Sequence, residues 1–126
     1  MLALLKKGGC HTMKPQVVVW SEKMQMATAI DILGRSKDHK KVYIIELKYC
    51  SHSTEATRRC YKLSHPGTHR MKGLQLLNSL YNHHQMQIRA TVRLFKANYP
   101  LPKGTEIIAG VVVACGDGGV LFYHMR

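Results

Sequence analysis

Short runs of β-branched and aromatic residues, separated by polar turns, recur along this chain and confine it to folds that contain a β-sheet. The strands predicted from these runs span residues 16–20, 24–33, 42–49, 107–114 and 120–123. The last two are joined by a Gly-Asp-Gly-Gly sequence, which is typical of a hairpin turn. A sheet is therefore the framework around which the rest of the chain must be arranged.

The segments between these strands carry other periodicities. Residues 53–62 indicate the beginning of a helix, and residues 68–81, capped by Thr68, indicate a clear helix with apolar side chains every three or four residues. Residues 88–97 alternate between two kinds of side chain, which predicts a further strand. The expected fold class is α/β (α+β), with one mixed sheet of about five to six strands flanked by helices. We expect a poorly structured lead-in at residues 1–15 and a single domain at residues 16–126.

The chain is strongly basic, and this limits the partners it can bind. It has 19 Lys and Arg residues against 7 Asp and Glu, a net charge of +12 at pH 7. Such an excess favours polyanions, because each neutralised phosphate releases condensed counterions. No apolar run reaches the ~18–20 residues of a membrane span, and the first residues do not have the pattern of a signal peptide. We therefore expect an intracellular (cytoplasmic or nuclear) protein that binds nucleic acid and no membrane.

Two acidic residues lie inside apolar strands instead of on polar turns, where an ordinary carboxylate belongs. Asp31 is flanked by apolar residues in 29–33 (AIDIL), and Glu46 lies in 42–49 (VYIIELKY). Because strand side chains alternate, Glu46 and Lys48 share a face. A hairpin loop centred between Asp38 and His39 would place Asp31 directly opposite Glu46, with Cβ atoms ~4.5–5.5 Å apart. A slip of two residues would leave them diagonal neighbours on the same face.

Two ionised carboxylates at that distance repel by roughly 4 kcal/mol at an effective dielectric of 20, so the pair requires compensation. Lys48 supplies one positive charge, and a divalent cation would supply the rest. Oxygen-only ligands suit Mg²⁺ or Mn²⁺. The alternative is a buried Asp–Lys–Glu salt-bridge cluster without chemistry. The scattered cysteines form no CxxC pair and indicate no zinc ribbon.

Asp31, followed on the next predicted strand by Glu46-Leu47-Lys48, resembles the signature of the PD-(D/E)xK nuclease superfamily. The flanking residues 18–22 (VVWSE), 29–33 and 44–48 (IIELK) are similar to its RecB and lambda-exonuclease branch. The resemblance extends over residues 17–123 and implies a restriction-endonuclease-like core. It also implies that Asp31, Glu46 and the backbone carbonyl of Leu47 bind the metal, Mg²⁺ or Mn²⁺. Lys48 would orient or activate the attacking water.

The same resemblance implies two further site residues. Glu22 corresponds to an acid ahead of the Asp strand, and Gln75 to a glutamine on the helix that follows the lysine strand; for Gln75 a solvated helix position is the alternative. The sequence departs from the family pattern at two places. Ile30 replaces the usual proline before Asp31, and the Gln-x-x-x-Tyr motif of the branch is absent, because Ser79 stands four residues after Gln75.

The implied activity is hydrolysis of DNA phosphodiester bonds, by an exonuclease or a structure-specific endonuclease, and the same residues would serve RNA equally. Two alternatives stay open: a non-catalytic nucleic-acid-binding module that retains the nuclease fold, and an RNA-processing endonuclease. The resemblance is compatible with a homo-oligomer or a larger protein complex. We interpret Trp20 as a core residue in preference to a base-stacking platform. A basic stretch is the candidate phosphate-binding face, with a solvated helix face as its alternative: Arg58, Arg59, Lys62, Arg70 and Lys72.

Overall fold

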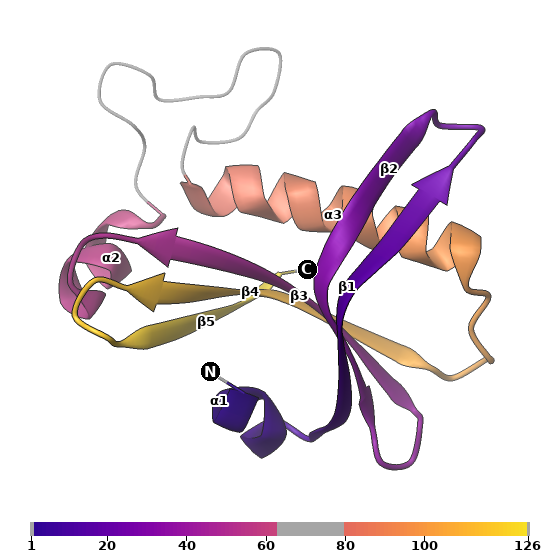
Figure 1. The fold of residues 1–126 in the computed structure, drawn as a ribbon, viewed down its shortest axis with the longest axis horizontal. Coiled ribbons are helices and arrows are strands. Elements are labelled where there is room, and N and C mark those ends of the chain that lie inside the picture. The colour runs from indigo at the N-terminus through magenta and orange to yellow at the C-terminus, as the bar shows by residue number, and fades with distance from the viewer. Residues whose placement is uncertain (1, 63–79, 126) are drawn as a thin grey trace.

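A five-stranded sheet forms the centre of the molecule in the computed structural model, which describes residues 2–62 and 80–125 (Figure 1). The strands are β1 (Cys10–Ser21), β2 (Met26–Ser36), β3 (Lys41–Cys50), β4 (Glu106–Cys115) and β5 (Val120–Met125). The helices are α1 (Leu2–Lys7), α2 (Thr54–Cys60) and α3 (Leu80–Asn98). The strands lie side by side in chain order. β3 and β4 are parallel and the other neighbours are antiparallel, so the predicted α+β class with one mixed sheet is confirmed.

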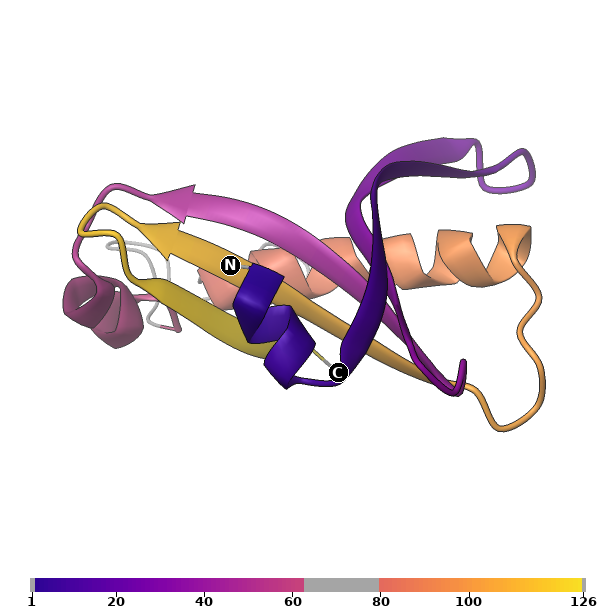
Figure 2. The same cartoon turned by 60° about the horizontal axis from the view of Figure 1, so that its bottom comes forward.

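The two faces of the sheet bury separate apolar clusters, and α1 and α3 lie on opposite sides of it (Figure 2). The cluster on the α3 side contains Val42 and Ile44 of β3 together with apolar residues of α3. The cluster on the α1 side contains Tyr43 and Ile45, the alternate residues of the same strand. Strand β3 is thus buried on both faces, as expected for a central strand with a parallel neighbour.

The β1–β2 hairpin twists where it leaves the sheet, so that its side chains change sides. Ile30 packs in the α3-side cluster and Ile32 in the α1-side cluster, although residues two apart in a regular strand share a face. The change occurs at Asp31, opposite Gln16, whose φ of 53° is in the left-handed region. Residues 17–30, which we call the hairpin arm, therefore bend away from β3 and pack against α3 (Figure 1).

The strand predicted at residues 88–97 is wrong, because these residues belong to helix α3. The alternation of apolar and polar residues is real, but the buried side chains recur every three or four positions, which is the spacing of one helix face. The buried residues of the helix are Ile88, Thr91, Leu94 and Phe95. The sheet therefore has one strand fewer than the order read from the sequence.

The segment predicted as a lead-in, residues 1–15, is more regular in the structure than expected. Residues 2–7 form α1, and β1 begins at Cys10, well before the predicted start at residue 16. Leu5 anchors this segment, since it is buried in the α1-side cluster. The helix predicted at residues 68–81 lies almost entirely outside the described residues. In the described part of the chain, no helix is both long and apolar enough to cross a membrane.

Candidate active site

Strand β3 places Glu46 and Lys48 on the sheet face that α3 covers, as alternation predicted from the sequence. Lys48 Nζ lies 3.5 Å from Glu46 Oε1. The Glu46 side chain is 13% exposed and the Lys48 side chain 28%. The carboxylate is therefore largely shielded from water, whereas the ammonium group can still reach a ligand at the surface.

Asp31 joins the two residues from the neighbouring strand. The hairpin register predicted from the sequence is confirmed by the pairs that run from Arg35 with Val42 to Ile32 with Ile45. In this register Asp31 and Glu46 come next, at the point where the backbone ladder ends. Asp31 Oδ2 there accepts a hydrogen bond from the Leu47 amide at 2.8 Å, so a carboxylate takes the place of the missing strand partner.

The pKa of Glu46 responds to the charges of both Asp31 and Lys48. Burial and, secondarily, the negative charge of Asp31 raise the pKa of Glu46, and the ammonium group of Lys48 offsets part of this rise. At a half-buried site, loss of water and a neighbouring negative charge disfavour the ionised carboxylate, whereas a neighbouring positive charge favours it. The site therefore favours the binding of positive charge.

Helix α3 contributes a site residue that the sequence analysis missed. Gln87 Nε2 donates to Glu46 Oε1 at 3.3 Å. The misassigned strand at residues 88–97 hid this glutamine, because it removed the helix that carries it over β3. The three-residue step from Ile88 to Thr91, followed by the three- and four-residue steps to Leu94 and Phe95, is a signal of this helix, although it does not place Gln87 beside Glu46. Gln75, the glutamine predicted for this role, lies outside the described residues.

Glu22 is not brought into the site. It is exposed in the β1–β2 turn, where its carbonyl accepts from the Gln25 amide. The turn lies beyond the Ser21–Met26 pair, about six residues along the hairpin from Gln16, or about 20 Å. The position next to Asp31 is occupied by Gln16, whose Nε2 donates to Asp31 Oδ1 at 3.4 Å.

The predicted phosphate-binding residues divide into two groups. Arg58 and Arg59 lie on exposed positions of α2, and Lys62 follows that helix with its ammonium 4.5 Å from the centre of the Tyr81 ring. Arg70 and Lys72 lie outside the described residues. The described part of the basic stretch is therefore exposed and attached to the chain that continues from β3.

A cluster of aromatic rings includes Tyr61 and His84, and His84 is near enough to Lys48 to feel its charge. The Tyr61 hydroxyl and His84 Nδ1 share a hydrogen bond, and the ring centres are 5.5 Å apart. Burial, followed by the positive charge of Lys48, lowers the pKa of His84 to about 4. His84 is therefore neutral at neutral pH and adds no positive charge beside Lys48.

This shift predicts that the fold loses stability in mild acid. An unfolded His84 takes up its proton near pH 6.5 and the folded one only near pH 4, so protonation favours the unfolded chain. The contribution is complete above pH 6.5, falls as the pH drops towards 4, and amounts to about 3 kcal/mol at most, less after solvent screening. Urea unfolding at pH 7 and pH 5 should show a smaller pH-dependent loss in His84→Gln than in the natural chain. Equal losses in both proteins would contradict it.

The oxygen donors at the site fit a cation that keeps part of its water shell. In the described residues, no three His, Cys, Asp or Glu side chains gather into one group. The acidic donors at this site are Asp31 and Glu46, whose negative charges interact. Mg²⁺ is commonly held in this way, by one or two carboxylates with water and phosphate completing its six positions. A fully protein-enclosed zinc site would need more ligands.

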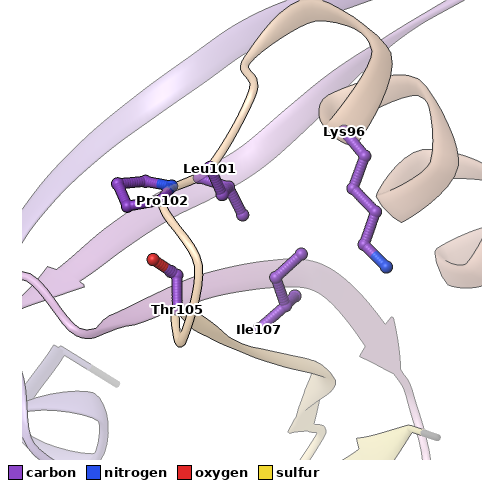
Figure 3. A pocket seen from close by; sticks show the side chains of 5 residues that line it. All are labelled: Lys96, Leu101, Pro102, Thr105 and Ile107. Carbon is purple, nitrogen blue, oxygen red and sulfur yellow. The ribbon is translucent and has the colours of Figure 1, made fainter.

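The site does not coincide with the pocket between the end of α3 and the loop that leads into β4 (Figure 3). This pocket has a volume of about 490 Å³, and Lys96 is the ionisable residue among those that line it. Thr105 and Ile107 place it at the start of β4, whereas Glu46 lies further along the sheet, beside Val111. It offers no partner for the two carboxylates.

No protein-family model matches this sequence, and no curated protein matches it either.

Proposed function

We propose that this chain is a divalent-metal-dependent nuclease with a restriction-endonuclease-like core that hydrolyses phosphodiester bonds of DNA. One observation carries the proposal: Asp31, Glu46 and Lys48 converge at the point where β2 separates from β3. A carboxylate pair on a chain of charge +12 is unfavourable for simple phosphate binding. It becomes useful if a cation lies between the carboxylates and the phosphate.

The roles of the side chains follow from their positions. Asp31 and Glu46 would hold Mg²⁺ or Mn²⁺, together with the backbone carbonyl of Leu47. When bound, the ion supplies positive charge to the phosphate and makes water a stronger acid. Lys48 Nζ is held at 3.5 Å by Glu46 and is still partly exposed. From there it orients the attacking water and stabilises the negative charge that develops on the phosphate.

The test of this function is cleavage by the purified protein of labelled linear, circular and branched DNA, and of RNA, with and without Mg²⁺ or Mn²⁺. We expect cleavage of DNA that requires the metal and stops with EDTA. Cleavage of RNA alone would assign an RNA-processing endonuclease instead. Binding of nucleic acid without cleavage under any metal condition would contradict the proposal and favour a non-catalytic binding module.

Gln87 should act as a positioning residue for Glu46, because its amide donates to the same carboxylate oxygen that contacts Lys48. Gln87→Ala is expected to lower the cleavage rate or the metal affinity by about tenfold to a hundredfold, the usual effect of losing a group that orients a metal ligand. The measurement is the Mg²⁺ concentration dependence of cleavage. The matched control is Gln85→Ala, about 200° away around the same helix; an equal effect in the two variants would contradict this role.

A further inference from the structure

The outer surface of the hairpin arm exposes an aromatic ring that the candidate active site does not use. Trp20 is 50% exposed and Val18 is 56% exposed, which corrects the interpretation of Trp20 as a core residue. Trp20 pairs with Ala27 and Val18 with Ala29. Paired residues of antiparallel strands point to the same side, so the indole ring is flanked by small side chains that leave its surroundings open.

This surface is supported by contacts on the other side of the arm. On the opposite side of the arm, Val17, Val19 and Ile30 are buried in the α3-side cluster. The Trp20 amide donates to the side-chain oxygen of Asn98, at the end of α3, at 2.6 Å. The strand that carries the ring is therefore held by apolar packing against α3 and by the hydrogen bond to Asn98. Such a ring can bind a flat ligand without first paying the entropy of ordering a loop.

The arm also sets the separation along β1 between this ring and the residue that contacts Asp31. Trp20 lies about four residues along β1 from Gln16, whose amide group contacts Asp31. At ~3.3 Å per residue this separation is about 13 Å, which corresponds to about four stacked bases. Lys14 and Lys23, both exposed, lie before and after the ring along the chain.

We propose that Trp20 is a stacking platform for an unpaired base of a nucleic acid whose backbone passes the Asp31–Glu46–Lys48 site. This rests on the proposed function for its ligand class. Every base has an aromatic face that can stack on a tryptophan, and unpaired or terminal bases expose that face, whereas bases inside a duplex do not. The excess of positive charge on the chain complements the phosphates of such a strand.

A second copy of the chain is a poorer occupant of this surface. A typical protein interface buries about 800 Å² on each partner, far more than the exposed parts of Trp20 and Val18 can supply. Two chains that each carry a charge of +12 also repel one another. Size and charge therefore both favour a single nucleotide base over a protein partner.

The sole tryptophan of the chain provides the probe. In EDTA, which prevents metal-dependent cleavage, a twelve-nucleotide oligo(dT) should quench the fluorescence of Trp20 more strongly than a blunt duplex of the same length. By anisotropy of a labelled oligo(dT), Trp20→Ala should bind about tenfold to a hundredfold more weakly than the natural chain, and Trp20→Phe should retain most of the affinity. Phe122→Ala, an exposed aromatic on β5, is the matched control and should bind unchanged. Circular dichroism would verify that each variant is folded.

Equal affinity of Trp20→Ala and the natural chain for oligo(dT) would overturn the inference. Two other outcomes would also overturn it: a change in Trp20 fluorescence that follows protein concentration without oligo(dT), which would indicate self-association, and a change that appears only when lipid vesicles are added in place of oligo(dT). The two proposals fail separately. A chain that cleaves DNA, yet binds oligo(dT) equally well without Trp20, loses only the stacking platform. A chain that binds oligo(dT) through Trp20 but never cleaves loses only the nuclease function.

Discussion

Replacing Lys48 by alanine is expected to slow DNA cleavage by about a hundredfold to a thousandfold while DNA affinity changes little. The ammonium group lies 3.5 Å from Glu46 and acts on charge that develops only during the reaction. Asp31→Asn should have an effect of similar size. The asparagine keeps an oxygen that can accept from the Leu47 amide, as Asp31 does at 2.8 Å, but it removes the negative charge that a cation requires. Initial cleavage rates at saturating Mg²⁺, with binding measured separately in EDTA, separate the two properties.

Lys41→Ala is the matched control for this prediction, because Lys41 is an exposed lysine at the other end of the same strand. It removes the same charge from the same element without touching the carboxylates. Its cleavage rate should stay within about threefold of the natural rate, since electrostatic effects at exposed positions are weak. Cleavage that survives both Lys48→Ala and Asp31→Asn would refute the assignment of the site.

Phe95→Ala should cause the largest loss of stability. Phe95 is 1% exposed, packs in the α3-side cluster, and stacks on Tyr99 with ring centres 5.2 Å apart. Truncation of a buried phenylalanine removes apolar contacts and leaves a cavity, and it typically costs about 3–5 kcal/mol. Because single domains are stable by only about 5–15 kcal/mol, the variant should unfold at much lower urea concentration.

The control for this loss is Met86→Ala on the same helix, where the side chain is 41% exposed. Its free energy of unfolding should change by no more than about 0.5 kcal/mol. Circular dichroism at 222 nm would follow both transitions. A loss below about 1 kcal/mol in Phe95→Ala would mean that α3 does not pack on the sheet as described.

The alternation in residues 42–49 was sufficient to predict the face shared by Glu46 and Lys48, because a strand repeats every two residues whatever its surroundings. The register of the β2–β3 hairpin followed from its short polar loop. The Ser36 hydroxyl contacts the Asp38 carboxylate at 2.7 Å in that loop and helps to fix its shape. Local rules thus placed Asp31 beside Glu46.

Residues 88–97 and the hairpin arm could not be predicted in this way. Arg-Ala-Thr-Val-Arg-Leu-Phe fits both a two-residue and a three-to-four-residue period, and packing against the sheet decides between them. The twist of β2 at Asp31 allows the apolar residues of the hairpin arm to pack against α3. A chain segment that lies far away in the sequence thus determines where Glu22 and Trp20 point. Only the folded molecule shows that Gln16 and Gln87 are the neighbours of the two carboxylates.

Asp31 lies where the hairpin arm joins the sheet. The arm is held to the rest of the molecule chiefly by α3, and from Asp31 towards the tip of the arm β2 has no backbone pairing with β3. Thermal separation of this arm would withdraw one carboxylate while the central strands stayed folded, a form of local opening that precedes global melting in many proteins. Heating should therefore abolish catalytic competence at a lower temperature than it abolishes the sheet signal. The highest temperature at which the molecule is active is then set by the strength of the packing between the hairpin arm and α3.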